Sequence, residues 1–451
     1  MIPLLPPGPK PSLQQLLNLR EVPHEFLAQL VEEHGHAVRY GVGPFAFSLF
    51  THPDAVQHIL VTQQRRYDKR TFQYRLLSDI TGRGLLTTDG DLWLRRRRLQ
   101  QPSFHRDRIV EFTPVFTHFA EQLAQRWRIS AERGDPVDVA AEMMHVTLQS
   151  VVKTLFGIEI GDRADSLARA ALTVLHHIMF RARTLGSVPR WLPIRLNREA
   201  RTALDLLDEA IRGTIARRRN NASRQFPGTP DLLARLMSAS DPDTGTSLTD
   251  DELRDEMITM LIAGHETVAS ALTWTWYLLA CNPETDAKLA EEVARTVGTR
   301  MPTSEDLPRL SYTAAVFQEA MRLYPPAWII TRRAREADTV MGYRVPRGST
   351  VVLSPFVTQR HPDFWADPER FDPERFSGGN SPRHRYAHFP FGGGPHLCIG
   401  NHFAMVEATL IMATIARDYR LTLADSSAVA VDPGVTLQPK GGLPMVVKSR
   451  R

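Results

Sequence analysis

The stretch "FGGGPHLCIG", residues 391–400, places Cys398 in a loop that contains four glycines and a proline. A zinc site needs about four protein ligands, and Cys398 with His396 and His402 supplies three at most, without the usual spacing. A catalytic thiol needs a histidine partner that the sequence alone does not identify. A buried, inert cysteine would not need three glycines and a proline before it. The composition of this loop therefore favours a ligating thiolate.

The residues around the cysteine favour a thiolate that ligates a large, flat cofactor. Gly394 and Gly400 permit the backbone to approach such a group closely, and Phe391 can pack beside the sulfur. A helix is predicted to begin near Ile399, and its N-terminal dipole favours the thiolate form of Cys398. The apolar face of this helix consists of Phe403, Val406, Leu410 and Ala413.

The length and composition of the chain are those of a globular protein. Its 451 residues are 42% hydrophobic and 23% charged, and they can bury an extensive core. We find no export signal at the N-terminus and no run that approaches the roughly 18 apolar residues of a membrane span. Cys281 and Cys398 lie far apart in the sequence, so a disulfide framework is not expected. These features predict a soluble, cytoplasmic protein without a membrane anchor.

Arginine carries most of the positive charge, which is formally +5 at pH 7. Arginine runs lie at residues 95–98, 217–219 and 332–333. Such runs are commonly solvated faces of helices, and the sequence has no nucleic-acid reading module or aromatic-interleaved basic surface. An acidic protein partner is therefore expected, and nucleic acid is not.

Helical patterning dominates the chain, most clearly across residues 105–325. Strand patterns lie at residues 36–60, 329–355 and 429–448, and Gly41, Gly43 and Pro44 indicate a turn within the first. Neither an internal repeat nor a long linker divides the sequence. We therefore predict one mainly α domain, residues 1–451, with small β-sheets toward its two ends.

One long helix is predicted from its two ends. Thr249 and Glu252 form a capping-box signature, and Pro283 lies just beyond the far end. The helix between them has about 32 residues and a length of about 48 Å. Its middle carries "AGHET", residues 263–267, where the glycine costs about 1 kcal/mol relative to alanine. Either helix packing or a function can explain this glycine.

The cysteine loop resembles the cysteine-ligand loop of the cytochromes P-450, F-x-x-G-x-[R/H]-x-C-x-G, at each defining position. The resemblance implies the cytochrome P-450 fold, mainly α with small β-sheets, around a buried haem b. It also implies that Cys398 supplies the axial thiolate to the iron and that His396 faces a haem propionate. Three further motifs follow the family's order, so the resemblance covers nearly the whole chain.

The first of these motifs is "QEAMRLYPP", with Glu319 and Arg322 three residues apart on one helix face. An E-x-x-R spacing alone is weak, because surface ion pairs have the same pattern. The segment "FDPERF", residues 371–376, resembles the family segment whose arginine joins this pair. The resemblance therefore implies a structural network of Glu319, Arg322 and Arg375 that serves folding.

The second motif is "GDLWLRRRRLQQPSF", residues 90–104. Trp93 and Arg97 are i, i+4 neighbours, so both side chains can reach one ligand, which in this family is the pair of propionates. Arg332 resembles the family's propionate-binding arginine on a later strand, with Arg333 as the alternative. Lys69 is a weaker candidate for the same role. An exposed surface position remains an equal alternative for each of these basic residues.

The third motif is "AGHET", which is similar to the family's [A/G]-G-x-[D/E]-T on its long central helix. The resemblance implies that Ala263 and Gly264 leave room for O2. Glu266 and Thr267 would deliver the protons that allow one oxygen atom to leave as water. Val268 stands where many members carry a second hydroxyl group.

The resemblance implies a monooxygenase that inserts one atom of O2 into an apolar organic substrate by hydroxylation or epoxidation. Electrons from NAD(P)H would arrive through a ferredoxin or flavodoxin with its reductase, since the chain has no flavin or nicotinamide segment. A fatty acid, terpenoid or carotenoid substrate and a monomeric state are expected. A peroxide-driven peroxygenase and a non-enzymatic haem sensor or carrier remain alternatives.

The substrate pocket and the partner surface are predicted by position. Leu85 is expected to contact the haem as well as to line the pocket. Arg95 and Arg98 lie about 180° and 120° from the direction shared by Trp93 and Arg97, so we expect both to be exposed to an acidic redox partner. The residues predicted to line the pocket are Leu85, Leu86, Met260, Ala327, Trp328, Ile329 and Ile330.

Overall fold

The computed structural model of the chain describes residues 4–42, 45–157, 162–184, 188–220, 231–377, 384–425 and 428–450. The chain divides into two compact units, each of which is described by itself. Unit 1 consists of Met1–Tyr74, Ala314–Asn401 and Val429–Lys440. Unit 2 consists of Arg75–Thr313, His402–Ala428 and Gly441–Arg451.

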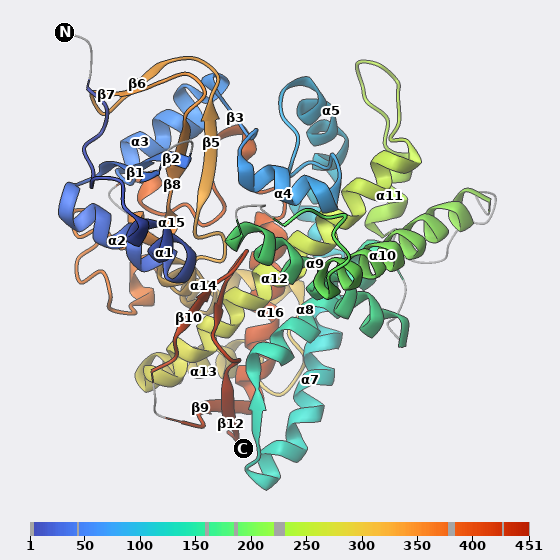
Figure 1. The fold of residues 1–451 in the computed structure, drawn as a ribbon. Helices are drawn as coiled ribbons and strands as arrows, with labels where there is room; N and C mark the ends of the chain where they lie inside the picture. The colour runs from blue at the N-terminus through green and yellow to red at the C-terminus, as the bar shows by residue number, and fades with distance from the viewer. Residues whose placement is uncertain are drawn as a thin grey trace. The chain divides into compact units, whose positions relative to one another are not determined.

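Unit 1 contains short helices and most of the strands (Figure 1). Its helices are α1 (Leu13–Glu21), α2 (Pro23–His34), α3 (Pro53–Gln57) and α15 (Pro355–Thr358). Its strands are β1 (Ala37–Val42), β2 (Phe45–Phe50), β3 (Tyr67–Asp68), β5 (Ile330–Ala334), β6 (Asp338–Val340), β7 (Tyr343–Val345), β8 (Thr350–Leu353), β10 (Val431–Pro433) and β11 (Leu437–Pro439). Helices α4 (Phe72–Thr81), α14 (Ser311–Leu323) and α16 (Asn401–Asp418) have residues in both units.

A five-stranded sheet organises unit 1 in the order β1-β2-β8-β5-β3. The β1–β2 hairpin is antiparallel, and β2 pairs in parallel with β8, with Phe50 opposite Leu353. Strand β5 pairs antiparallel with both β8 and β3. The sheet is buried between two apolar clusters, one containing Phe50 and Ile59 and the other containing Leu27 and Trp328. This sheet positions the basic residues on β5.

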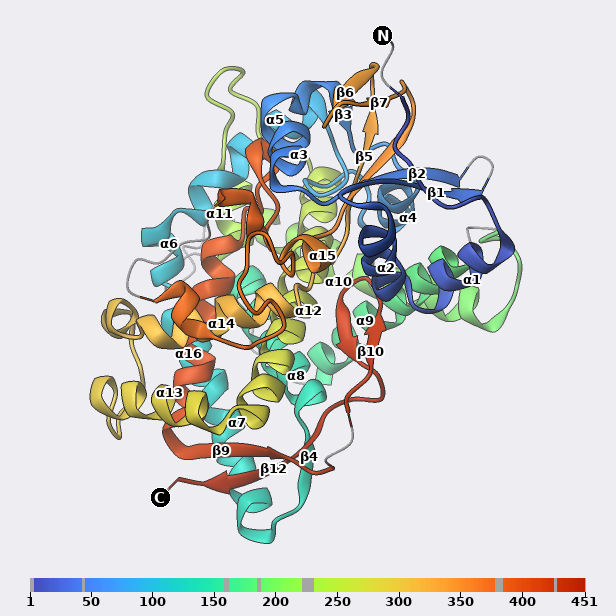
Figure 2. The same ribbon diagram turned by 90° about the vertical axis from the view of Figure 1, so that its left-hand side faces the viewer.

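Unit 2 is a bundle of helices with one small sheet (Figure 2). Its helices are α5 (Gly90–Gln100), α6 (Arg106–Val110), α7 (Thr113–Arg133), α8 (Val139–Phe156), α9 (Asp162–Arg183), α10 (Arg195–Asn220), α11 (Leu232–Ser238), α12 (Asp250–Cys281) and α13 (Pro283–Thr296). Strands β4 (Pro136–Asp138), β12 (Pro444–Ser449) and β9 (Tyr419–Leu423) form the sheet in that order.

Helix α12 has the length and the ends that the sequence predicts. Its 32 residues begin after Thr249, whose side chain accepts the Glu252 N–H while the Glu252 carboxylate accepts the Thr249 N–H. Helix α8 packs along α12, and both views show the two helices side by side (Figures 1 and 2). Trp274, Trp276 and most other residues of α12 are buried. The helix is therefore the core element of unit 2.

The predicted fold class, mainly α with small β-sheets, is confirmed. Strands lie within each predicted strand region, but the end of the first region is helical, with α3 at Pro53–Gln57 and a π-helical turn at His58–Thr62. The turn predicted at Gly43 and Pro44 lies outside the described residues. Strands β3, β4 and β9 fall outside the predicted strand regions, and β3 and β4, with two and three residues, are too short to show a periodicity. The single-domain assignment remains a prediction. Within the part of the chain that is described, no helix has both the length and the apolarity needed to cross a bilayer.

Candidate functional site

The backbone around Cys398 is held in a tight and specific path in unit 1. Gly394 has φ +65°, in the left-handed region, and a Cβ added there would lie 1.9 Å from the carbonyl oxygen of Leu60. A side chain at this position would therefore push the loop off its support. The Cys398 N–H donates to the Phe391 carbonyl at 3.0 Å, and the thiol itself is exposed. The loop presents the sulfur on a fixed backbone.

The residues next to the thiol differ slightly from the predicted arrangement. Helix α16 begins at Asn401, two residues after the predicted start at Ile399. His396 is half-buried in the short 3-10 turn Gly394–His396. A Cβ added at Gly400 would lie 3.9 Å from the Cys398 sulfur, which is an ordinary contact. The steric need for glycine is therefore at position 394 rather than at position 400.

Gln359 supports the chain that leads into the cysteine loop, and the sequence analysis missed it. Its side chain is fully buried, and its amide donates to the carbonyls of Met321 at 3.0 Å and Arg322 at 3.1 Å. Its carbonyl accepts the Phe389 N–H at 2.8 Å. Gln359 therefore ties this segment to α14. A glutamine two residues after the mostly apolar run at 351–357 was the available signal.

Glu319, Arg322 and Arg375 meet in unit 1, as the resemblance implies. Arg322 donates to both carboxylate oxygens of Glu319, at 2.7 and 2.8 Å, and neither side chain is exposed. The Arg375 Nε atom lies 3.4 Å from Glu319 Oε1, without hydrogen-bond geometry, and Arg375 instead donates to the Asp367 carbonyl at 3.0 Å. Burial raises the pKa of Glu319, while Arg322 opposes this shift. The bidentate pair is the tighter part of the network.

Arg322 also organises the chain that follows β8. Its guanidinium donates to three carbonyl groups, those of Gln359, Pro368 and Arg370, at 3.0, 2.6 and 3.0 Å. The guanidinium carbon lies 5.0 Å from the ring centroid of Trp365, in cation–π contact. One side chain thus satisfies several backbone acceptors of an irregular segment.

The two arginines of β5, Arg332 and Arg333, have different hydrogen-bond partners. Arg332 is 7% exposed and donates to the Tyr74 hydroxyl at 3.0 Å and to the Thr331 carbonyl at 2.9 Å. No described carboxylate pairs with Arg332. Arg333 instead donates twice to Asp68, at 3.1 and 2.6 Å. Of the two arginines, Arg332 has the guanidinium that is available to an added carboxylate.

Lys69 lies beside Arg332 in unit 1. Its ammonium group is 5.8 Å from the ring centroid of Tyr74, which also contacts the Arg332 guanidinium at 5.8 Å. Lys69 is buried, which is unusual for a lysine. The structure thus brings together two of the basic residues that the sequence singled out for one role.

The four residues after α14 that were expected to line the pocket have different environments. Ala327 is exposed, and Ile329 and Ile330 are half-buried. Trp328 is buried in an apolar cluster of unit 1, and its indole N–H donates to the Gly434 carbonyl at 3.1 Å. Its pocket assignment remains a prediction, and its side chain is already engaged in the core.

The middle of α12 is exposed on one side only. Ala263 is exposed, and Gly264 and Thr267 are partly exposed, whereas the residues around them are buried. The Thr267 hydroxyl donates to the Ala263 carbonyl at 2.7 Å, and Glu266 is buried. Helix α12, which is otherwise largely buried in unit 2, thus presents small residues and one hydroxyl group at a single place.

Gly264 and His265 face α8. A Cβ added at Gly264 would lie 3.3 Å from Val151, closer than most Cβ contacts, so the glycine permits close helix packing. The His265 carbonyl accepts the Thr147 hydroxyl at 3.1 Å. Burial lowers the pKa of His265 to about 4, so its ring is neutral and donates to the Leu261 carbonyl. Helix packing explains this glycine, and its oxygen-binding role remains a prediction.

The loop that carries Leu85 and Leu86 is joined to α12 by two acidic side chains, the half-buried Asp255 and the buried Glu256. The Arg83 N–H donates to Asp255 at 2.7 Å, and the Leu85 N–H donates to Glu256 at 2.9 Å. Leu85 is buried, and Leu86 is half-buried. The sequence analysis missed both acids, although an adjacent acidic pair within an otherwise apolar helix was a signal. The two leucines therefore have fixed positions relative to α12, on which Met260 is half-buried.

The glycines in this loop permit its close approach to α12. A Cβ at Gly82, where φ is +66°, would lie 2.1 Å from the Asp255 carboxylate. A Cβ at Gly84 would lie 2.1 Å from the Thr259 hydroxyl. Glycine at both positions is therefore required by packing.

The arginine run of α5 divides by burial. Trp93 is buried and Arg97 is half-buried. Arg96, which the sequence analysis did not single out, is 4% exposed, and its guanidinium lies 2.6 Å from the fully buried Glu256. Burial raises the pKa of Glu256, and Arg96 opposes this shift. This pair fixes α5 against α12.

The prediction that Arg95 is exposed is wrong. Arg95 is half-buried and donates to Glu252 and to the Ser247 carbonyl, both at 2.9 Å. It supports the cap of α12, whose acidic first turn attracts it. Arg98 is exposed and pairs with Asp243. Arg98 is therefore the better candidate of the two for contact with a partner.

The residues present fit a haem with a thiolate ligand. Unit 1 offers an exposed thiol on a fixed loop and a buried guanidinium without a described carboxylate partner. Unit 2 offers an exposed patch of small residues on α12, with Trp93 and Arg97 on α5. A thiolate suits iron, and buried basic groups suit propionates. These donors match the cofactor that the sequence motifs imply.

A second group of side chains has ligand atoms close enough for a metal ion. The ligand atoms of His36, His361 and Asp363 lie within 4.8 Å of one another. The Asp363 N–H donates to His361 Nδ1 at 3.1 Å, so the proton of this ring is on Nε2. Neither ring nitrogen of His361 is then a ready ligand, and we assign no cation to this group.

Comparison with known proteins points in the same direction as the site. The cytochrome P450 family model matches residues 3–444. The chain is 36% identical to a cyclooctatin synthase of Streptomyces melanosporofaciens, over 98% of this chain and 95% of that protein. It is 34% identical to a pentalenene oxygenase of Streptomyces avermitilis, over 92% of this chain and 91% of that protein. It is also 34% identical to a cyclooctat-9-en-7-ol 5-monooxygenase of S. melanosporofaciens, over 98% of this chain and 95% of that protein.

Proposed function

The chain belongs to the cytochrome P450 family, and from this premise we propose that it oxidises a cyclic terpenoid with Cys398 as its axial haem ligand. As a member of the family, the protein is a haem b-dependent monooxygenase with a cysteine thiolate ligand. It uses O2 and takes electrons derived from NAD(P)H through redox partners. The relatives do not favour the peroxygenase or the haem sensor.

The single observation that supports the ligand assignment is the exposed thiol on a loop whose path requires glycine at 394. When bound, the haem activates O2, so that one atom enters the substrate and the other leaves as water. Cys398 would hold the iron through its sulfur. The N-terminus of α16 follows the cysteine and favours its thiolate form.

Side chains that carry N–H donors are proposed to hold the propionates. Arg332 is preferred to Arg333, because Arg333 is occupied by Asp68 while Arg332 has no described carboxylate partner. Lys69, His396, Trp93 and Arg97 complete the proposed set. Each buried cation would gain a charge-assisted hydrogen bond from a carboxylate.

Proton delivery is proposed for Thr267 and Glu266. The Thr267 hydroxyl donates to the Ala263 carbonyl within its own helix, and rotation about χ1 frees this proton for a group beside Ala263. Glu266 is one residue away and is buried, so it can return a proton to the site. The exposed methyl group of Ala263 keeps the place small and apolar.

The substrate class is proposed from the relatives and from the apolar residues near the loop and helix. The names of two relatives specify pentalenene and cyclooctat-9-en-7-ol, a hydrocarbon and an unsaturated alcohol. Of the fatty acid, terpenoid and carotenoid classes, a cyclic terpenoid is therefore preferred. The proposed contacts are Leu85, Leu86, Met260, Ala327, Ile329 and Ile330, with Trp328 behind them.

The electron donor is proposed to be a ferredoxin or flavodoxin with its reductase. Arg98 remains exposed on α5, where it can attract an acidic partner despite its pairing with Asp243. A cytoplasmic location is proposed because neither of the two cysteines, Cys281 and Cys398, is in a disulfide. A monomeric state is proposed as well.

Two measurements test the assignment. Reduced protein treated with CO should show the strongly red-shifted Soret band of thiolate ligation, and Cys398→Ser should lose it. Pentalenene, a saturated fatty acid of equal carbon number and a carotenoid should then be compared by the haem spectral shift. The terpenoid should bind most tightly. A fatty acid or a carotenoid that binds more tightly would refute the substrate class but not the ligand, whereas an unchanged spectrum in Cys398→Ser would refute the ligand.

A further inference from the structure

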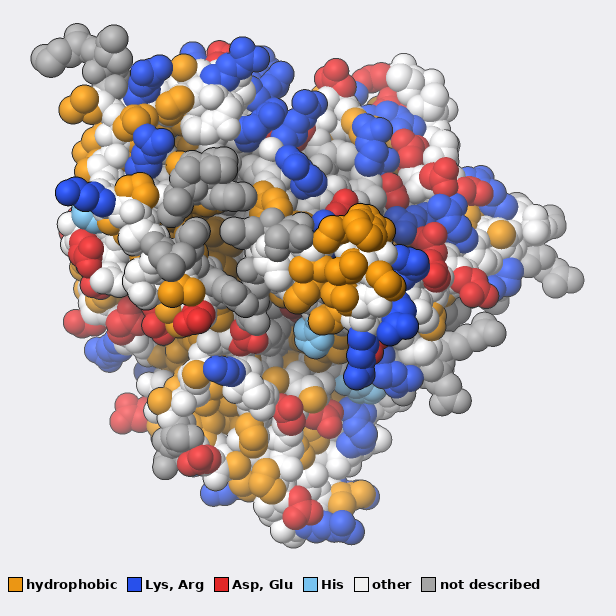
Figure 3. Space-filling model, in the orientation of Figure 1, with side chains coloured by type: hydrophobic (Ala, Val, Ile, Leu, Met, Phe, Trp, Pro, Cys, Tyr) orange, Lys and Arg blue, Asp and Glu red, His pale blue; other side chains and the backbone are white. Residues whose placement is uncertain are grey.

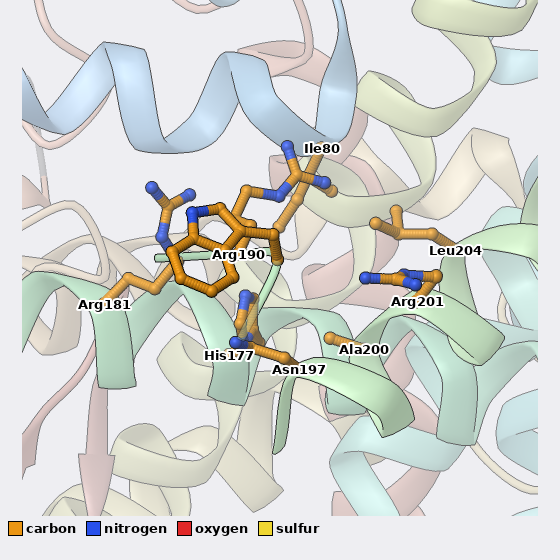
Figure 4. A pocket seen from close by; sticks show the side chains of 9 residues that line it. Ile80, His177, Arg181, Arg190, Asn197, Ala200, Arg201 and Leu204 are labelled. Atoms are coloured by element: carbon orange, nitrogen blue, oxygen red, sulfur yellow. The ribbon is translucent and has the colours of Figure 1, made fainter. Parts of the chain in front are cut away.

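A cavity of about 430 Å³ lies within unit 2, beside α4, α9 and α10. Figure 4 shows His177 and Arg181 of α9 and Asn197 and Arg201 of α10 around this space, with Ile80 of α4 opposite. None of these residues belongs to the motifs described above. The cavity therefore needs its own explanation.

Positive charge exceeds negative charge in this cavity. Arg181, Arg190 and Arg201 line it. Arg181 pairs with Asp79, and an Arg190 Nη1 atom lies 3.9 Å from the same carboxylate. Arg201 has no ion-pair partner among the described residues. Three guanidinium groups thus share one carboxylate, which leaves two positive charges without compensation by the described residues.

Three buried polar atoms at the cavity have no hydrogen-bond partner among the described residues. They are His177 Nδ1, Arg181 Nε and Asn197 Oδ1. His177 and Asn197 are each only 5% exposed. The Asn197 amide nitrogen donates to the Pro189 and Leu192 carbonyls, at 2.9 and 2.8 Å, which fixes the direction of its oxygen. Buried polar atoms are normally satisfied, and the two nitrogens can donate to an anionic ligand, whereas the Asn197 oxygen can only accept.

The imidazole of His177 can act as a neutral donor in the cavity. Burial lowers the pKa of His177, and the positive charges of Arg181 and Arg190 lower it further, against a weaker opposite effect of Asp79. The ring is therefore uncharged near neutral pH, with one N–H that is able to donate. Arg181 Nε supplies a second buried donor.

The mouth of the cavity is apolar. Trp191 lines it and is 75% exposed, and Ile80, Ala200 and Leu204 add further apolar surface. Leu196, on the first turn of α10, is also exposed. Figure 3 shows an apolar patch over α9 and α10 that is bordered by arginine and lysine side chains. An exposed tryptophan beside arginines that outnumber the carboxylates suits a ligand with both an apolar and an anionic part.

We propose that this cavity binds the phosphate group of a small phosphorylated molecule whose apolar part contacts Trp191. A phosphate monoester carries about −1.5 to −2 charges at pH 7, which matches the two uncompensated positive charges better than a carboxylate does. Arginine forks bind phosphate oxygens in pairs. This site is independent of the haem assignment and of the terpenoid substrate.

Calorimetric titration of the haem-loaded protein at constant ionic strength tests the proposal. The probes are hexyl phosphate, inorganic phosphate and hexan-1-ol. Hexyl phosphate should bind at least tenfold more tightly than either of the other two, since it alone has both parts. Arg201→Gln breaks no described ion pair and should lower the affinity for hexyl phosphate at least tenfold.

A matched control and a second variant complete the test. Arg195→Gln replaces an arginine of the same helix that is 86% exposed and pairs with Glu199, and it should leave the affinity unchanged. Trp191→Ala should weaken hexyl phosphate but not inorganic phosphate. Equal affinity for hexan-1-ol and hexyl phosphate would overturn the proposal, and so would an unchanged affinity in Arg201→Gln or an equal loss in Arg195→Gln.

Discussion

Replacement of Arg96 by methionine should destabilise the protein in a pH-dependent manner. The change removes the only described cation within ion-pair distance of Glu256, a carboxylate with no exposed side-chain surface. The Leu85 N–H still donates to that carboxylate at 2.9 Å. Methionine has a length similar to that of the arginine stem, so the apolar packing of α5 is largely retained.

The expected loss follows from burial of an uncompensated charge. Removal of one partner from a buried ion pair costs roughly 3–5 kcal/mol. At about 2.1 cal/mol/K per residue, the unfolding entropy of a chain of this length is about 1 kcal/mol per kelvin. Each 1 kcal/mol of lost stability therefore lowers the midpoint of thermal unfolding by about 1 °C. The midpoint of thermal unfolding should therefore fall by about 3–5 °C at pH 8.

The loss should become smaller in acid. Burial raises the pKa of Glu256 and Arg96 opposes the shift, so the variant should raise this pKa further. An acid whose pKa is higher in the folded state than in the unfolded state loses stability as pH rises above the unfolded value. At pH 5 the variant's carboxyl group takes up a proton and the penalty decreases.

Thermal unfolding followed by circular dichroism at pH 8 and pH 5 checks both expectations. Arg98→Met removes an exposed pair with Asp243 and should change the stability by less than about 1 kcal/mol. Addition of Glu256→Gln to the Arg96→Met variant should restore stability at pH 8, since the glutamine keeps an acceptor for Leu85 without a charge. An Arg96→Met midpoint within 1 °C of the parent at pH 8, or an equal loss at both pH values, would refute the reasoning.

Arg322→Gln should leave little folded protein, because it breaks a buried bidentate pair and three carbonyl contacts. Arg375→Gln should lower the stability by only about 1 kcal/mol. Soluble yield and thermal unfolding compare the two variants. Glu407→Gln should raise the unfolding midpoint more at pH 8 than at pH 5. Burial raises the pKa of Glu407, so the parent protein loses stability as the pH rises above the pKa of this group in the unfolded state. An equal gain at both pH values would contradict this. Thr267→Ala should keep NAD(P)H consumption but form less product per NAD(P)H, with peroxide or water instead; an unchanged ratio would argue against proton delivery.

Local sequence determined the elements that depend on nearby residues. The capping box of Thr249 and Glu252 and the proline at 283 defined α12 to its terminal residues, because caps act within one turn. The glycines before Cys398 indicated a tight loop, because a left-handed backbone is a property of a single residue. The E-x-x-R spacing placed Glu319 and Arg322 on one face of a helix, because residues three positions apart are neighbours on a helix surface.

Only the tertiary structure decided which polar groups meet across long distances in the sequence. Helical geometry gave directions for Arg95 and Arg98 relative to Trp93 and Arg97, but it could not show that Glu252 and Glu256, some 160 positions away, pair with Arg95 and Arg96. The roles of Gln359 and of Asp68 depend in the same way on strands and helices that pack together only in the folded chain. Burial changes the energy of a charged group by several kcal/mol, and the residues that compensate such a charge are selected by the fold, not by the neighbouring sequence.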